Sequence, residues 1–321
     1  MLKLEKKEWI FDEPTPTPQC HASTVLPLSN KGALAAWFGG TKESAADVMI
    51  WVSRFSQQGW SAPCCVTPEK GIPHWNPVLF RIDEKNVALY YKLGELPIGN
   101  WKTKVMYSSD EGLTWSAPEE LVPGDDSGGR GPVKNKALRV SDGAILAPAS
   151  VERGPWRCHI DRSIDNGKTW CKIPIPVPEG ESVNMIQPSL WESAPGQIHA
   201  LMRTNRGRIW RSDSGDYGLS WCTAYPTAMP NNNSGIDCVR LSDGRIVLVC
   251  NPNEADWGAR SPLSVFVSAD NGITFEKALD LENEEGEYSY PAIVTQENKL
   301  LITYTWNRKK ISFCVLDAGE V

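Results

Sequence analysis

Hydrophobic and polar positions alternate along the chain in short β-prone runs separated by turns rich in Gly, Asp, Asn and Ser. Six units each contain a turn flanked by two such runs, as in residues 137–140 and 144–146 around the turn at 141–143. Short alternating runs on both sides of a polar turn predict β-hairpins. The six turns occupy residues 29–32, 83–86, 141–143, 194–196, 242–244 and 297–298. No segment of useful length has the period of a helix.

A second pattern repeats at nearly the same interval. The sequence Ser-Ser-Asp-Glu-Gly-Leu-Thr-Trp at residues 108–115 returns at 163–170, 214–221 and 268–275, and a worn copy lies at 53–60. In each intact copy the Asp accepts backbone hydrogen bonds in a turn, and the Gly supplies a positive φ. The closing aromatic residues are Trp60, Trp115, Trp170, Trp221 and Phe275. Repeats of about 50 residues are typical of four-stranded propeller blades.

Six hairpins at this spacing predict an all-β fold, a six-bladed β-propeller that forms a single domain over residues 1–321. An N-terminal strand around residues 7–11 is expected to pair with the last blade, formed near residues 311–316, because this pairing removes an open sheet edge. Pro14, Pro16 and Pro18 then lead the chain, extended, into the first inner strand.

Composition narrows the possible partners. The net charge of −6 and the absence of a basic stripe weigh against nucleic acid. No apolar run is long enough for a membrane span or a secretory signal. The nine cysteines have no metal-like spacing, which favours free thiols in a reducing cytoplasm. We therefore expect a cytoplasmic protein without metal or cofactor, with its oligomeric state open. The 14 tryptophans suit both blade packing and sugar stacking.

Polar and aromatic residues gather where each inner strand begins. In a propeller these strand ends meet around the axis at one face, so the segments predict a polar axial pocket. A lone Asn or Ser here is ordinarily a turn cap, and a lone His is as often packed as functional. The candidates are His21, His74, Trp75, Asn76, Lys134, Asn135, Lys136, Gln187, Asn233, Ser234, Tyr288 and Tyr290.

Charged residues just beyond the second strands form another group of candidates. Glu43 lies in the loop after the second strand of unit one, and Glu152 occupies the equivalent place in unit three. Arg203 ends the second strand of unit four, and Arg308 follows that of unit six. An arginine binds a carboxylate through a planar, bidentate fork, although either arginine could equally serve a structural ion pair.

The repeated boxes resemble the Asp-boxes of the sialidase superfamily of six-bladed propellers, in register over the whole chain. The stretches at residues 287–293 and 304–308 are similar to a bacterial subgroup usually labelled predicted neuraminidases. This resemblance implies a pocket for an acidic sugar in which three arginines bind the carboxylate. It also implies a tyrosine nucleophile assisted by a glutamate, and an aspartate as acid/base; a neutral phenol suits an anionic substrate.

Matched position by position, the resemblance places Tyr288 at the nucleophile, with Tyr290 as its rival, and Arg203 at the second arginine. Glu43 falls near the acid/base loop. The first arginine is absent from residues 21–24, and Gln187 stands at the position of the assisting glutamate. Arg308 is a candidate for the third arginine. These departures count against sialic acid hydrolysis and leave other carbohydrate chemistry open.

Three hypotheses follow for a small imported oligosaccharide or acidic sugar. A sialidase-like glycoside hydrolase acting on an acidic or deoxy sugar would bind the anion through Lys134, Lys136 or Arg203, with Glu43 or a pocket histidine as proton donor. A uronate lyase would instead use His21 or His74 with Tyr288 or Tyr290 to abstract a proton. A non-catalytic sugar-binding propeller would offer stacking platforms, namely Trp37, Trp75, Trp101 and Trp306.

Overall fold

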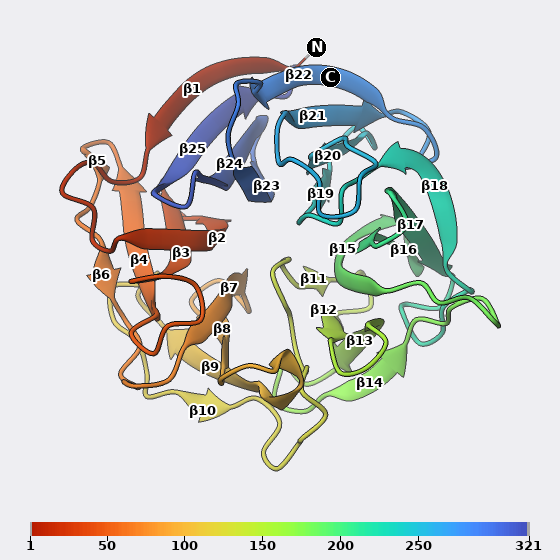
Figure 1. Ribbon diagram of the computed structural model, residues 1–321, viewed down its shortest axis with the longest axis horizontal. Helices are drawn as coiled ribbons and strands as arrows, with labels where there is room; N and C mark the ends of the chain where they lie inside the picture. Colours follow the sequence, from red (N-terminus) through yellow and green to blue (C-terminus); the bar gives the residue numbers. More distant parts are fainter. Residues whose placement is uncertain (1, 320–321) are drawn as a thin grey trace.

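The computed structural model describes residues 2–319 and contains six antiparallel sheets arranged as blades around a central axis (Figure 1). The chain is all-β, and the helical content of the described residues is the short 3-10 turn η1 (Ile98–Asn100). The predicted six-bladed β-propeller is therefore confirmed. Within the same residues, no helix is long and apolar enough to cross a membrane.

In five of the blades the strands follow chain order from the axis outward, and the sixth takes its outer strand from the N-terminus (Figure 1). Blade I contains β2 (Gln19–Pro27), β3 (Ala33–Gly40), β4 (Met49–Ser56), β5 (Gly59–Trp60) and β6 (Cys64–Cys65). Blade II contains β7 (His74–Arg81), β8 (Val87–Leu93), β9 (Lys102–Ser108) and β10 (Glu119–Glu120). Blade III contains β11 (Leu138–Arg139), β12 (Ile145–Val151), β13 (Arg157–Ser163) and β14 (Cys171–Pro174).

The other three blades complete the ring. Blade IV contains β15 (Met185–Ala194), β16 (Gln197–Thr204), β17 (Arg208–Ser214) and β18 (Tyr225–Pro230). Blade V contains β19 (Asp237–Arg240), β20 (Ile246–Cys250), β21 (Leu263–Ser268) and β22 (Glu276–Glu282). Blade VI contains β23 (Tyr288–Gln296), β24 (Lys299–Trp306), β25 (Lys310–Asp317) and β1 (Lys3–Trp9). All six predicted turns join the first two strands of a blade.

The N-terminal strand closes the ring as predicted. β1 pairs antiparallel with β25, from Lys3 opposite Asp317 to Trp9 opposite Ser312. The strand begins earlier than the sequence indicated, because its first residues are mostly charged and lack the alternation that reveals a buried strand. Ile10 and Phe11 follow the strand and are buried in the core.

The repeated boxes form tight turns between the third and fourth strands of blades II to V. In the box of blade II, Asp110 Oδ1 accepts the backbone N–H groups of Leu113 at 3.0 Å and Thr114 at 2.9 Å. Gly112 has a φ of 84°, and a Cβ at this residue would lie 2.6 Å from Leu34 of blade I. The glycine therefore lets this box approach the neighbouring blade closely, and Gly218 and Gly272 do the same in blades IV and V.

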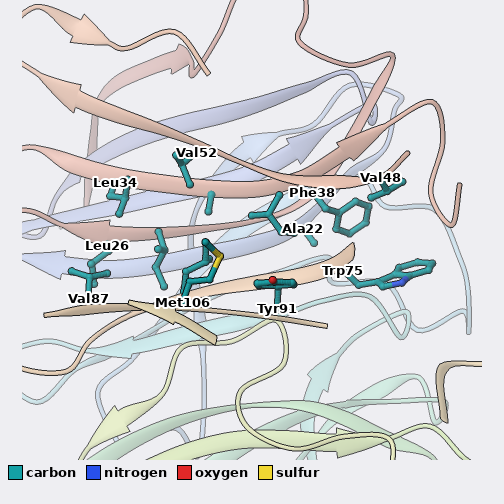
Figure 2. Packing of buried hydrophobic residues seen from close by; sticks show 14 of the residues in the cluster. Ala22, Leu26, Leu34, Phe38, Val48, Val52, Trp75, Val87, Tyr91 and Met106 are labelled. Carbon is teal, nitrogen blue, oxygen red and sulfur yellow. The ribbon is translucent and has the colours of Figure 1, made fainter. Parts of the chain in front are cut away.

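The hydrophobic core lies between neighbouring blades. Figure 2 shows one such cluster, in which Leu34 and Phe38 of blade I face Trp75 and Tyr91 of blade II. Burial of this apolar surface is the main force that fixes one blade against the next. The inner strands are consequently held rigidly around the axis, where the candidate site lies.

Candidate functional site

Each inner segment has a kink at its start. One non-glycine residue per blade takes the left-handed conformation there, with φ between 44° and 65°. In four blades the ladder to the second strand also shifts register at this point, as a β-bulge does. A left-handed backbone is strained for residues other than glycine and concentrates at functional sites. The six residues are Ala22, Asn76, Lys134, Gln187, Asn233 and Tyr290.

The antiparallel pairing of first and second strands brings two sets of residues to one face. Within a blade, the start of the first strand lies beside the end of the second strand. The loop that connects the second strand to the third therefore lies at the same end of the axis. A cavity of about 230 Å³ occupies this place. Its lining is drawn from all six blades: His21, Glu43, Trp75, Asn76, Ile98, Trp101, Glu152, Trp156, Ile186, Gln187, Arg203, Trp257, Arg260, Tyr290 and Arg308.

Arg203 is the most deeply buried charge of the cavity, with 1% of its surface exposed. Its Nε donates to Asn233 Oδ1 at 3.0 Å, and its Nη1 donates to Gln187 Oε1 at 3.1 Å and to the Tyr290 hydroxyl at 3.0 Å. These partners are neutral, and no carboxylate of residues 2–319 forms an ion pair with this guanidinium. A buried cation without a counter-charge is costly, so the site is suited to an anion.

Two further arginines of the lining, from blades V and VI, share a carboxylate. Arg260 Nη1 and Arg308 Nε donate to Glu287 Oε1 at 2.8 and 2.9 Å. Arg308 also forms an ion pair with Glu43. Arg260 and Arg308 are thus matched by two carboxylates, Glu287 and Glu43, whereas Arg203 has none among residues 2–319.

Tyr290 stands between the arginines and a histidine. Its ring lies 5.7 Å from the Arg203 guanidinium carbon and 5.6 Å from that of Arg260. The centroid of the His21 ring lies 4.3 Å from the centroid of the Tyr290 ring. Burial, reinforced by nearby arginines, lowers the pKa of His21 well below its usual value, so the imidazole is neutral. Its buried Nδ1 has no hydrogen-bond partner within residues 2–319.

Tryptophans form two walls of the cavity. Trp75 and Trp101 stack with their ring centroids 4.6 Å apart. Trp156 and Trp257 meet edge to face at 6.3 Å, and Trp257 keeps 61% of its surface exposed. Flat apolar surfaces beside charged groups suit a ligand with one apolar face and several polar substituents, as in a sugar ring.

Glu152 is a carboxyl group on the blade III side of the cavity. Burial raises its pKa above the usual value of a glutamate, although the charge of Arg203 acts in the opposite direction. Within residues 2–319 it has no hydrogen-bond or ion-pair partner. The same residues contain no group of three or more His, Cys, Asp or Glu side chains placed to hold a metal ion.

Several predicted residues lie at the axis without lining the cavity. Lys134 Nζ donates to the carbonyls of Ile236 and Pro291 at 2.5 Å and to Asn135 Oδ1 at 2.8 Å. Lys136 donates to both oxygens of Asp237 at 2.9 Å. Asn135 Nδ2 bonds the carbonyls of Gln187 and Pro188. These donors join blades III to VI, and none of the three side chains belongs to the lining of the cavity.

Two of the predicted catalytic residues, Tyr288 and His74, do not line the cavity. Tyr288 is packed in the core, and its hydroxyl donates only a 3.4 Å bond to the Glu285 carbonyl. His74 is fully buried, and its Nδ1 lies 2.9 Å from the Val48 carbonyl. Ser234 donates to Asn251, while Asn233 holds Arg203 from outside the lining. The remaining candidates reach the cavity: His21, Glu43, Trp75, Asn76, Gln187, Arg203, Tyr290 and Arg308.

Of the four tryptophans proposed as stacking platforms, two line the cavity and two pack elsewhere. Trp75 and Trp101 line the cavity, whereas Trp37 is fully buried against Phe11 and Trp306 packs on Trp9.

Neither Arg260 nor Trp257 was predicted from the sequence. Both lie in the connection between β20 and β21, which has no hydrophobic alternation and no repeat marker. Their position after the second strand of blade V, equivalent to that of Glu152 in blade III, is the signal that could have identified them.

The fold and the cavity together define a six-bladed propeller with an arginine-rich, tryptophan-walled axial site. A family model described as a BNR repeat-like domain matches residues 31–302, so the chain belongs to that family. No curated protein sequence matches the chain significantly.

Solved structures share the fold at low sequence identity. A protein of unknown function from Dyadobacter fermentans superposes with a TM-score of 0.79 at 18% identity, covering 98% of this chain and 99% of the other. The NanB sialidase of Streptococcus pneumoniae gives 0.75 at 13% identity, covering 97% of this chain and 70% of NanB. The sialidase of Trypanosoma rangeli gives 0.75 at 13% identity, covering 94% and 55%. The chain thus shares the overall fold of these two sialidases.

Proposed function

We propose that the protein is a sialidase-like glycoside hydrolase that cleaves a terminal acidic sugar in the axial cavity. The observation that carries this proposal is Arg203, a buried guanidinium whose polar partners are all neutral. The carboxylate of a substrate would supply the missing counter-charge. A cavity of about 230 Å³ is small compared with sites for large ligands and suits one sugar ring.

The proposed roles follow from the contacts. Arg203 binds the substrate carboxylate, and Arg260 and Arg308, which are paired with Glu287 and Glu43, line the cavity beside it. The Tyr290 hydroxyl lies 3.0 Å from Arg203 Nη1, so a positive charge stabilises its oxygen as a nucleophile. Trp75 and Trp257 provide apolar surfaces for the sugar ring.

Arg203→Met tests this proposal. With sialylated and uronic-acid oligosaccharides as substrates, we expect wild-type protein to release reducing ends. The variant should lose about 100-fold in kcat/KM, because a charge-assisted contact of ~3 kcal/mol disappears. Arg240→Met, at an exposed arginine on β19 outside the cavity, is the matched control and should retain wild-type turnover. Unchanged activity in Arg203→Met, or binding without any turnover by the wild type, contradicts the proposal.

A uronate lyase is the second candidate, favoured by the contact between neutral His21 and Tyr290. These residues would accept the proton next to the substrate carboxylate while Arg203 neutralises the resulting negative charge. Elimination creates a double bond, so the product absorbs in the ultraviolet. A rise in unsaturated-uronate absorbance would identify the lyase, whereas reducing ends without this absorbance would identify the hydrolase.

A further inference from the structure

The cavity contains two carboxyl groups in opposite surroundings. Glu43, from the loop between β3 and β4, forms an ion pair with Arg308. Glu152, which follows β12, has no hydrogen-bond or ion-pair partner within residues 2–319. Two carboxyls whose surroundings favour different protonation states are the usual arrangement for separate catalytic roles.

The backbone around Glu152 directs its side chain to the reaction site. Ser150 lies two residues earlier in β12, and Glu152 lines the cavity directly after the end of this strand. The Ser150 hydroxyl accepts a 3.4 Å hydrogen bond from the backbone N–H of Gln187, one of the cavity-lining residues. The Glu152 carboxyl therefore extends from blade III toward the inner strand of blade IV and the cavity.

The electrostatic setting favours the neutral acid at Glu152. Burial raises the pKa of this carboxyl, and the nearest charge acting against this effect is that of Arg203. A substrate carboxylate bound to Arg203 would cancel that charge, so substrate binding itself would further favour the protonated form. Glu43, by contrast, is engaged in the ion pair with Arg308.

We propose that Glu152, and not Glu43, donates the proton to the leaving glycosidic oxygen, while Glu43 remains an anion that orients Arg308. This assignment rests on the proposed cleavage of a glycosidic bond in the cavity. In hydrolysis the Tyr290 oxygen bonds to the anomeric carbon and its proton passes to solvent. The bond between this carbon and the glycosidic oxygen breaks, its electron pair stays on that oxygen, and the oxygen takes the Glu152 proton and leaves as an alcohol. Water then adds its oxygen to the anomeric carbon and gives one proton to the Glu152 carboxylate, while the bond to Tyr290 breaks and the phenolate recovers a proton from solvent, so both groups are restored.

The same role holds for elimination, because the leaving oxygen needs a proton in both reactions. The leaving group would then lie on the blade III side, against Trp156, which is four residues beyond Glu152 and also lines the cavity.

Substrates with different leaving groups test the assignment in Glu152→Gln. An alkyl alcohol needs protonation as it leaves, whereas an acidic phenol does not. We therefore expect the variant to lose about 100-fold or more in kcat/KM on a natural oligosaccharide and less than about tenfold on a nitrophenyl glycoside of the same sugar. Glu43→Gln should affect both substrates alike. Glu179→Gln, at an exposed glutamate outside the cavity, is the matched control and should behave as the wild type on both.

The outcomes separate the two proposals. Equal losses on both substrates in Glu152→Gln, or a selective loss on the oligosaccharide in Glu43→Gln, would overturn the assignment while leaving the glycosidase proposal intact. Failure of the wild type to cleave either substrate would overturn the proposed function. Infrared titration of the carboxyl band in wild type and Glu152→Gln gives an independent measurement. The assignment predicts a carboxyl, lost in the variant, that titrates above the usual range of glutamate, and it fails if the two titrations coincide.

Discussion

Two tyrosines separated by one residue have different environments because of a local change in the backbone. In a regular strand Tyr288 and Tyr290 would face the same side. The register shift between Ser289 and Ala292, with a φ of 54° at Tyr290, separates them. Tyr288 consequently packs in the core, and Tyr290 enters the cavity beside Arg203. The backbone conformation at one residue decides which hydroxyl is available for chemistry.

Tyr290→Phe is expected to lower kcat by about 100-fold or more, because the oxygen that acts as the proposed nucleophile is removed. Tyr288→Phe removes only a long hydrogen bond and should retain turnover. Steady-state kinetics on both variants, with thermal unfolding to check that each is folded, makes the comparison. Comparable kcat values for the two variants would contradict the role of Tyr290.

At the scale of elements, the repeated box is a turn that stabilises itself and contacts the next blade. Hydrogen bonds from the Thr114 side chain and backbone lower the pKa of Asp110 to about 2. The folded protein therefore stabilises the ionised form of Asp110 more than the unfolded chain does. The stabilisation is complete above the unfolded pKa, near 3.8, and is lost as the pH falls through the folded value.

Asp110→Asn should accordingly lower the unfolding free energy at pH 6 and have a smaller effect as the pH falls from about 4 to about 2. Urea unfolding of wild type and variant across this pH range measures the difference. The charge is mostly exposed, so the effect is expected to be modest. A difference in stability that is constant with pH would show that the charge of Asp110 does not stabilise the turn.

At the scale of the whole molecule, a buried polar centre joins the blades at the axis. Asp237 of blade V accepts hydrogen bonds from Lys136 of blade III at 2.9 Å, Ser189 of blade IV at 2.6 Å and the backbone N–H of Ile293 in blade VI at 2.9 Å. One carboxylate thus connects four blades beside the cavity. Together with the closure of β1 on β25, it keeps the inner strands in one ring.

Asp237→Ala is expected to reduce the unfolding free energy by about 2–4 kcal/mol, because partly buried Lys136, buried Ser189 and the Ile293 N–H would all lose their acceptor. The double variant Lys136→Met/Asp237→Ala should lose less than the sum of Lys136→Met and Asp237→Ala measured singly. Asp243→Ala breaks a surface ion pair with Arg245 and serves as a control, with an expected loss of at most about 1 kcal/mol. Urea unfolding measures all the variants, and additive losses would mean that the axial pair does not act as a unit.

The local chemistry of the sequence determined the number of blades, the six hairpin turns and the boxes. These features depend on hydrogen bonds between residues a few positions apart and on alternation along single strands, so each repeat carries its own signal. Ring closure was also evident, although the charged residues of β1 concealed where the strand begins. Glu43, Arg203 and Arg308 could be proposed because they lie at or just beyond the ends of second strands, and these ends meet around the axis.

The tertiary structure alone decided which polar side chains reach the cavity. Tyr290 was separated from Tyr288 by a bulge, Lys134 was directed into the contacts between blades, and Arg260 came from a connection without any pattern. The site is assembled from six blades that are distant in sequence. Each side chain takes its direction from backbone kinks and from partners on other blades, and no local pattern in the sequence encodes these long-range contacts.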